Sequence, residues 1–207
     1  MVADRLTAPG EGSMRVIAGT NRGMALLCPN TRDTRPITDR VKESLFNVLQ
    51  NYDLLVGRHV ADLFSGVGSL GLEALSRGAD FVTFVEQDPK IVAFLEKNIA
   101  KACFVASSRV VRANAFRVGA PLDAIGRKYD LVFVDPPYAK AREVGAGSGL
   151  AQLFEVLAPQ VAEEGVAVVR TEKRVSVLDA YGPFRAVDRR DWGTMSLTLL
   201  QAREHDE

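Results

Sequence analysis

The sequence is poor in the residues that most often build metal sites and nucleophilic catalysis. Its 207 residues include two histidines, His59 and His205, and two cysteines, Cys28 and Cys103. Neither pair has the spacing of metal ligands, and two isolated cysteines form no disulfide framework. We therefore expect no metal site, no histidine-based catalysis, and free thiols in a reducing compartment.

Net charge and long apolar segments are also missing. Lys+Arg and Asp+Glu both number 26, so any surface for a polyanion must be local. No apolar run approaches the ~20 residues that cross a bilayer, and the N-terminus lacks a signal-peptide core. We expect a cytoplasmic protein with no membrane partner. The hydrophobic content of 47% is enough for one sizeable core.

The patterned sequence begins at Met14. Residues 1–13 are small and polar and are expected to form a disordered tail. Residues 14–52 are expected to form a small extension, in which strands at 15–18 and 24–28 make a β-hairpin and Thr38 caps a helix. Residues 53–207 then form the main domain.

Strand and helix patterns alternate through the main domain, which predicts a doubly wound α/β fold with a mostly parallel sheet. We expect seven strands in that sheet, the last of them antiparallel in a C-terminal hairpin around Trp192-Gly193-Thr194. The hairpin strands are expected at 184–191 and 195–202.

A glycine-rich turn follows the first strand of this domain. Gly66, Gly68 and Gly71 have the spacing of a dinucleotide fingerprint, and Glu86 stands 20 residues after Gly66. Such a turn brings the backbone close to a ligand at a helix N-terminus, and the acid can accept from ribose hydroxyls. The pattern predicts a nucleoside-containing cofactor but fits both NAD and S-adenosylmethionine. Asp62, just before the turn, favours the second because it could pair with the methionine ammonium.

The fourth strand of the domain ends in Asp135-Pro136-Pro137-Tyr138. The two prolines stiffen the backbone and present only carbonyls, while Asp135 adds a carboxylate and Tyr138 an aromatic plate. This combination at a strand end predicts a pocket for a flat, amine-bearing group. The alternative is a strand ended by a proline turn. A reductase would need a proton relay for which the sequence offers no clear candidate.

At these motifs the chain resembles a known family. The segment 62–77, Glu86 and the Asp135–Tyr138 tetrapeptide resemble class I S-adenosylmethionine-dependent methyltransferases, Rossmann-like enzymes that modify exocyclic amines. The block 35–47 resembles the leading segment of the RsmD family, which methylates guanine N2 in small-subunit ribosomal RNA. The resemblance extends from about Met14 to about Ala202. Many relatives carry Asp at the position of Asn114.

This resemblance implies a 16S ribosomal RNA substrate, with a site of the guanine-966 type, in naked RNA or in an assembled subunit. Nothing in the sequence demands more than a monomer, and we expect one. It also implies three groups of site residues. The catalytic group is Asp135, Pro136, Pro137 and Tyr138. The cofactor contacts are Asp62, Phe64, Ser65, Gly66, Gly68, Glu86, Asn114, Ala115 and Asp135. The candidate phosphate contacts, which are basic residues of the leading segment and of the loop after Tyr138, are Arg15, Arg22, Arg35, Arg40, Lys42, Lys140 and Arg142.

Two other functions fit the same residues. The tetrapeptide also serves amino-methyltransferases that act on adenine N6 or cytosine N4 of DNA. A non-catalytic nucleotide-binding or RNA-binding module could retain the glycine turn as a relict.

Overall fold

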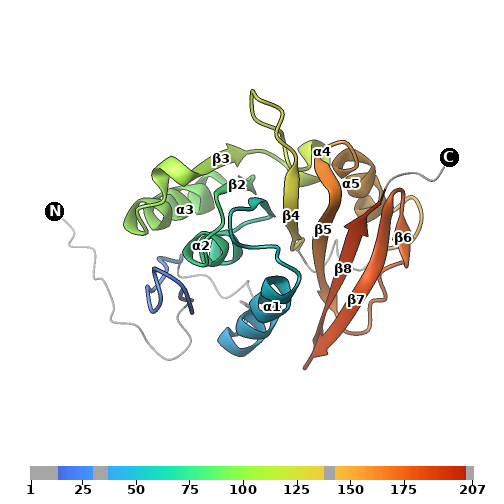
Figure 1. The fold of residues 1–207 in the computed structure, drawn as a ribbon, viewed down its shortest axis with the longest axis horizontal. Coiled ribbons are helices and arrows are strands. Elements are labelled where there is room, and N and C mark those ends of the chain that lie inside the picture. Colours follow the sequence, from blue (N-terminus) through green and yellow to red (C-terminus); the bar gives the residue numbers. More distant parts are fainter. Residues whose placement is uncertain (1–13, 30–36, 138–142, 204–207) are drawn as a thin grey trace.

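The protein is built on one eight-stranded sheet. The fold is known from a computed structural model that describes residues 14–29, 37–137 and 143–203. The strand order is β3-β2-β1-β4-β5-β8-β7-β6, with β1 to β5 parallel and β8 antiparallel to β5 (Figure 1). The strands are β1 (His59–Leu63), β2 (Phe81–Glu86), β3 (Ser108–Arg112), β4 (Tyr129–Val134), β5 (Val161–Glu172), β6 (Ala180–Tyr181), β7 (Phe184–Trp192) and β8 (Met195–Ala202).

The central strands are apolar because both faces of the sheet are covered. All five residues of β1 are buried, and so are five of the six residues of β4. The order places β1 and β4 side by side although two strands lie between them in the chain. This reversal of strand order makes the crevice in which open α/β sheets bind ligands.

The expected fold class is confirmed, with one difference in strand count. The C-terminal hairpin pairs β7 with β8 as the sequence predicts. The eighth strand is β6, a two-residue strand that pairs with the outer side of β7. Its brevity explains why no period-2 pattern marks it in the sequence.

Helices cover both faces of the sheet. The residues of α1 (Asp39–Asn51), α2 (Ser69–Ser76) and α3 (Pro89–Lys101) pack into one buried cluster with β1, β2 and β4. The helices α4 (Ala115–Val118) and α5 (Gly149–Leu157) pack into a second cluster on the other face. A short 3-10 turn, η1 (Val105–Ser107), precedes β3. No helix in the described ranges has both the length and the apolar character needed to cross a membrane.

The N-terminal hairpin is present, but its two strands pair over fewer residues than expected. Its only ladder pairing is an antiparallel bridge between Arg15 and Ala25, supported by a 2.9 Å hydrogen bond from the Val16 amide to the Met24 carbonyl. Val16 and Leu26 are buried in the same cluster as α1. The leading segment and the sheet therefore share one hydrophobic core.

Helix α1 begins where the sequence predicts. Thr38 Oγ1 accepts a hydrogen bond from the Val41 amide at 3.4 Å, which caps one of the free N–H groups of the first turn. Its apolar stripe is buried, whereas Arg40, Glu43 and Asn47 are exposed. The polar face of the helix is therefore turned to solvent. In Figure 1 the ribbon of α1 lies below that of β4.

Candidate active site

The glycine turn between β1 and α2 assigns different tasks to its glycines. A Cβ on Gly71 would lie 2.3 Å from Phe84 Cε1, so this glycine permits close packing of α2 on the sheet. A Cβ on Gly68, whose φ is 90°, would lie 2.6 Å from Leu95 Cδ1. A Cβ on Gly66, with φ of 55°, would meet no atom within 4 Å. Only at Gly66 does the missing side chain leave open space beside the backbone, as a bound ligand requires.

Two neighbours of this turn also have features that are typical of a binding site. Phe64 has a positive φ of 58°, and its ring packs on that of Phe116 with centroids 4.8 Å apart. A bulky residue in this conformation carries strain, which is concentrated at functional sites. Ser65 is only 8% exposed, and its Oγ has no hydrogen-bond partner among the described residues. An orphaned hydroxyl here is suited to contact a ligand.

Glu86 closes the turn from the end of β2. Its Oε2 accepts a hydrogen bond from the Gly66 amide at 3.1 Å, and its Oε1 accepts from Gln87 and Asp88 amides at 2.8 and 2.9 Å. These three bonds fix the carboxylate at the carboxyl edge of the sheet. Ala113, which precedes Asn114, donates its amide to the backbone carbonyl of Glu86 at 3.1 Å, so the end of β3 lies beside the end of β2.

Asn114 caps α4 and Ala115 is its first residue, directly after the end of β3. The Asn114 side chain caps the helix by accepting from the Phe116 amide at 3.0 Å, and Ala115 is 2% exposed. An asparagine cap does this as well as an aspartate would. The difference from the family pattern at this position is therefore tolerated by the local fold.

Asp62 lies at the end of β1, almost fully hidden. Its Oδ2 accepts a 2.8 Å hydrogen bond from the Gly71 amide, and 2% of the residue is exposed. Burial raises the pKa of Asp62 well above its usual value; the Gly71 hydrogen bond opposes this rise, and the charges of Asp135 and Glu86 add to it. A cationic ligand group at this position would relieve the cost of the ionised form.

Asp135 directly follows β4, on the strand next to Asp62. Arg170 of β5 donates a hydrogen bond from Nε to Asp135 Oδ1 at 2.6 Å. Burial raises the pKa of Asp135, and the Arg170 guanidinium partly offsets this rise. Pro136 is buried and Pro137 exposed, while Tyr138 lies outside the described residues.

Together these groups lie at the carboxyl edge of β1, β2 and β4. The buried carboxylate of Asp62 and the half-buried carboxylate of Asp135 favour a ligand that carries positive charge, and Glu86 presents a fixed carboxylate. The open space at Gly66 and the orphaned Ser65 hydroxyl add room and a polar contact. Both the ammonium and the sulfonium of S-adenosylmethionine suit this charge pattern. No group of three or more metal-ligating side chains is found in the ranges that the structure covers.

A family model described as "Conserved hypothetical protein 95" matches residues 14–201, which span nearly the whole chain. The chain belongs to this family, the RsmD family of methyltransferases.

Two members of the family show how far the likeness extends. YlbH of Bacillus subtilis (strain 168) is 31% identical over 193 residues, which are 92% of this chain and 100% of YlbH. The ribosomal RNA small subunit methyltransferase D of Escherichia coli (strain K12) is 41% identical over 131 residues, 63% of each chain. The match to the Escherichia coli protein therefore spans less than two thirds of its length.

Solved structures agree with this assignment. The Escherichia coli protein yhhF superposes with a TM-score of 0.74 at 30% identity, covering 93% of this chain and 99% of its own. An RNA methyltransferase of Salinibacter ruber in complex with S-adenosyl-L-homocysteine has a TM-score of 0.60 at 16% identity, covering 84% and 97% of the two chains. The second likeness concerns the fold alone. The fold is that of S-adenosylmethionine-dependent methyltransferases.

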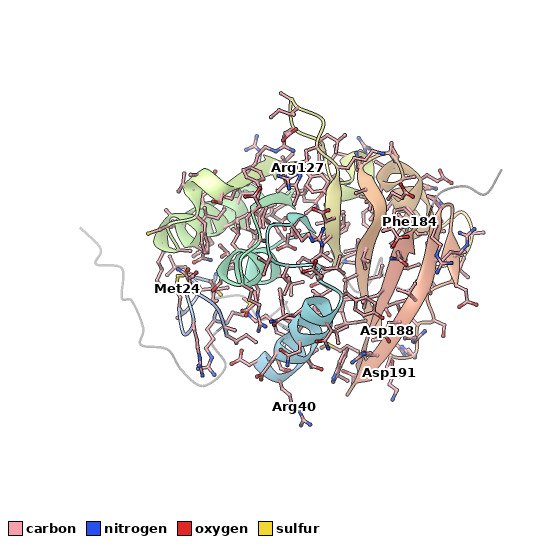
Figure 2. All side chains as sticks on the ribbon, in the orientation of Figure 1. Met24, Arg40, Arg127, Phe184, Asp188 and Asp191 are labelled. Carbon is pink, nitrogen blue, oxygen red and sulfur yellow. The ribbon has the colours of Figure 1, made fainter. Side chains whose placement is uncertain are left out.

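The arginines expected to meet RNA phosphates are exposed where the structure describes them. Arg15, Arg22 and Arg40 are all solvent-accessible, and Figure 2 shows Arg40 projecting away from α1. Arg15 and Arg22, with Arg77, line a hollow of about 240 Å³ between the N-terminal hairpin and α1. Arg15 also pairs with Asp39 at 2.7 Å. The other candidates, Arg35, Lys140 and Arg142, lie outside the described residues.

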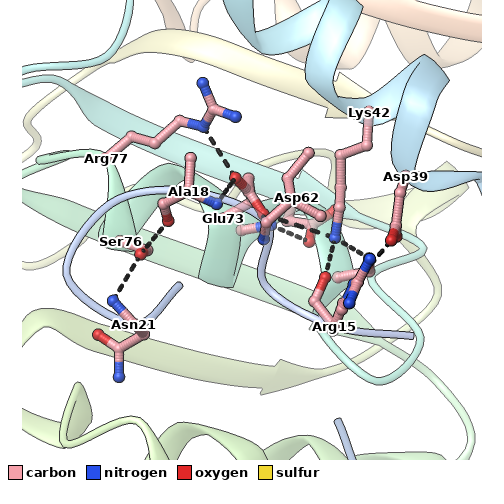
Figure 3. Close-up of polar contacts among 12 residues, drawn as sticks. Arg15, Ala18, Asn21, Asp39, Lys42, Asp62, Glu73, Ser76 and Arg77 are labelled. Carbon is pink, nitrogen blue, oxygen red and sulfur yellow. Dashed lines mark hydrogen bonds and ion pairs between the residues drawn. The ribbon is translucent and has the colours of Figure 1, made fainter. Parts of the chain in front are cut away.

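Lys42 does not fit the role of a phosphate contact, and this expectation needs correction. The residue is 1% exposed, and its Nζ donates to the Arg15 carbonyl at 2.5 Å and to Ser69 Oγ at 3.2 Å (Figure 3). It also lies 3.5 Å from Glu73 Oε2. On helix α1 Lys42 falls beside the apolar stripe, so its position on the helix turns it inward, where it joins the hairpin to α2.

Sequence reasoning missed two charged residues of structural weight. Glu73 reads as an ordinary exposed helix residue, yet it is 0% exposed. Arg170 is the second, and a signal for it does exist. It directly follows the apolar run 166–169 of Val and Ala residues, and an arginine that such a run carries into the protein interior needs a partner.

Proposed function

We propose that this chain transfers a methyl group from S-adenosylmethionine to the exocyclic N2 amine of a guanine in small-subunit ribosomal RNA. The observation that carries the proposal is the position of Asp135 and Pro136. They place a carboxylate and a proline carbonyl at the end of β4, one strand away from the glycine turn and Asp62.

Asp135 and Pro136 hold the amine. Guanine N2 is a weak nucleophile because its lone pair is delocalised into the ring. The Asp135 carboxylate and the Pro136 carbonyl each accept one N–H, which orients the amine and draws electron density back to nitrogen. Orientation of this kind supplies much of the acceleration in a reaction whose methyl group is already activated on a sulfonium.

The same carboxylate is suited to receive the proton. The amine loses one proton as its new N–C bond forms. Because burial raises the pKa of Asp135, the carboxylate is more basic than an exposed aspartate. Tyr138 stacks on the extruded base in this proposal, and a stacked base contributes about 1–3 kcal/mol.

Asp62, Ser65 and Glu86 hold the cofactor. Asp62 pairs with the methionine ammonium, Glu86 accepts from the ribose hydroxyls, and the Ser65 hydroxyl contacts the methionine portion. Gly66 leaves room for the close approach of these groups. Phe64, Asn114 and Ala115 border the crevice at the ends of β1 and β3.

Ribosomal RNA is proposed as the substrate from membership of the family and from the name of the Escherichia coli relative. We extend this to a guanine-966-type site and to a monomeric, cytoplasmic enzyme. The exposed arginines of the leading segment supply local positive charge on a chain whose formal net charge is zero.

Nucleoside analysis of the product tests this function. Purified protein and S-adenosylmethionine are incubated separately with naked 16S RNA, with assembled small subunits and with DNA, each lacking the modification. We expect N2-methylguanosine in one or both RNA arms and no methylated base in DNA. Methylated adenine N6 or cytosine N4 in the DNA arm would replace this proposal with the DNA amino-methyltransferase alternative.

A site variant tests the role of the tetrapeptide. Asp135→Ala should lower the methylation rate by about 10²–10⁴-fold, because it removes both an orienting acceptor and a base. The affinity for S-adenosylmethionine, measured by calorimetry, should stay within a few-fold. Asp80→Ala is the matched control, since Asp80 is an exposed aspartate whose carboxylate pairs with Arg127. Equal turnover by the two variants would remove Asp135 from the mechanism.

A further inference from the structure

Arg170 meets Asp135 because of strand register. β4 and β5 run parallel, and Val134 is paired with Val169, so the next residue of each strand lies side by side at the carboxyl edge. The side chains are 13% and 22% exposed, and their Nε–Oδ1 distance is 2.6 Å. The contact is therefore short and largely shielded from water.

Stability alone does not explain an arginine at this position. On β5, Val166 and Val168 point to the same face as Arg170 and are buried in the core. An apolar residue would continue that stripe, and replacing a shielded ion pair by apolar residues often leaves stability unchanged or raises it. Instead, the next position on this face carries the Arg170 guanidinium, which contacts Asp135, the residue proposed to hold the substrate amine.

The surroundings of Asp135 make a nearby cation important. Asp62 lies on the adjacent strand β1, and Glu86 lies one strand beyond on β2; the charges of both Asp135 and Glu86 act on Asp62. Carboxylates this close disfavour one another's ionised forms. At Asp135 burial raises the pKa, and Arg170, on the other side of β4, opposes that rise.

We propose that Arg170 is a positioning residue that anchors Asp135 Oδ1, so that Asp135 Oδ2 is presented to the substrate amine. This inference rests on the proposed role of Asp135 in methyl transfer. A planar guanidinium bonded through Nε fixes the rotation of the carboxylate about its Cβ–Cγ bond, which a mobile ammonium would do less well. It also keeps the carboxylate ionised, as an acceptor of amine hydrogens must be.

Three variants separate positioning from folding. Arg170→Gln removes the charge, and Arg170→Lys keeps the charge but loses the planar group. Arg174→Gln is the matched control, because Arg174 also bonds a carboxylate through Nε at 2.6 Å, that of Glu172, but is 69% exposed. All three are compared by thermal unfolding, by cofactor affinity and by the pH profile of methyl transfer.

For Arg170→Gln we expect kcat to fall by up to about 10²-fold while KM for RNA changes much less. The acid limb of its pH profile should move to higher pH, because the pKa of Asp135 rises further without the guanidinium. Arg170→Lys should return the acid limb closer to its position in the unmodified chain than it returns kcat. The control Arg174→Gln should match the unmodified chain in both. A fall in activity with an unmoved acid limb would assign Arg170 to folding only and overturn the proposal.

A measurement without RNA keeps this test apart from the proposed function. The carboxyl carbon of Asp135 is followed by ¹³C NMR as a function of pH, assigned by its absence in Asp135→Asn. Titration at higher pH in Arg170→Gln than in the unmodified chain supports the pairing whatever the substrate is. Identical titration curves overturn it, even if ribosomal RNA is methylated.

Discussion

Two buried carboxylates on the same side of the sheet, Glu73 and Asp62, are treated differently by their surroundings. Glu73 accepts hydrogen bonds from the Ile17 and Ala18 amides at 2.8 and 3.0 Å and from Arg77 Nε at 2.8 Å. Lys42 adds an ammonium at 3.5 Å. Among the described residues, Asp62 accepts a hydrogen bond from one donor, the Gly71 amide, although its burial is equally deep.

The difference separates a carboxylate that the fold itself compensates from one that we propose a ligand compensates. The charge of Glu73 is compensated within the fold by two cations, Lys42 and Arg77. Through these contacts Glu73 joins the hairpin, α1 and α2 (Figure 3). Asp62 has no cationic side chain paired with it in the described part of the chain, and in the proposed function the methionine ammonium of the cofactor supplies the positive charge. Under-satisfied buried acids cost stability, and they persist where a site needs them.

The strongest test of this comparison is to remove the structural carboxylate. Glu73→Ala should lower the free energy of unfolding by about 3–5 kcal/mol, since it leaves Lys42 and Arg77 shielded without their partner. Urea unfolding measures this loss. Glu155→Ala, at an exposed site of α5, is the control and should stay within about 0.5 kcal/mol of the unmodified chain. A small loss at Glu73 would mean that the two carboxylates do not differ in this way.

The glycine turn offers a second test in which packing and binding separate. Gly71→Ala forces a Cβ to within 2.3 Å of Phe84 Cε1 and should destabilise the fold by about 1–3 kcal/mol through overpacking. The Cβ of Gly66→Ala meets no atom within 4 Å. This variant should therefore lose only the about 1–2 kcal/mol of stability that a non-glycine residue loses in the left-handed backbone conformation. Gly66→Ala should lose cofactor affinity. Gly71→Ala should keep it in the fraction of the protein that remains folded. Calorimetry and thermal unfolding on both variants measure the two effects.

If Gly66→Ala binds S-adenosylmethionine as well as the unmodified chain, the open space beside Gly66 is not part of the cofactor site. The proposed cofactor site would then rest on Asp62, Ser65 and Glu86.

The sequence predicts the sheet well because its signals are local. Gly66, Gly68 and the strand-length apolar runs fix where strands end, and the alternation of elements fixes their parallel arrangement. The edge strand β6 escapes prediction because two residues carry no periodicity.

Long-range partners are what the sequence could not supply. Lys42 looks like an exposed basic residue until the hairpin folds over it, and its ion pair with Glu73 spans separate helices. Arg170 and Asp135 are 35 residues apart and meet only through the β4–β5 register. Charge within a segment shows that a residue is basic, but which way it faces depends on packing from elsewhere in the chain.

The functional carboxylate can be tested by removing its charge only. The pKa of Asp62 is raised in the fold, so the folded protein holds a proton more tightly than the unfolded chain does. The stability that this provides is complete below the pKa of an unfolded aspartate and is lost as pH rises through the folded pKa. Without cofactor, Asp62→Asn should therefore gain stability relative to the unmodified chain as pH rises.

Urea unfolding across pH measures this difference, and calorimetry measures its functional cost. The variant should bind S-adenosylmethionine about tenfold less tightly, since a neutral hydrogen bond replaces a charge-assisted one at a loss of about 1.5 kcal/mol. A stability difference that stays constant with pH would show that Asp62 does not titrate within the fold, and that the fold compensates it as it does Glu73.

The smallest effect on the fold should come from a charge that touches neither carboxylate. Arg40 lies exposed in the first turn of α1. A negative charge is favourable at this end of a helix, so Arg40→Glu should cost no stability and should improve the interaction with the helix dipole by about 0.3 kcal/mol. Stability and cofactor affinity should stay unchanged, but RNA binding should weaken and its salt dependence should fall by about one phosphate contact. Lys128→Glu, just before β4 at the opposite edge of the sheet, is the control. Equal loss of RNA binding in both variants would mean that overall charge, rather than the face formed by α1, attracts the RNA.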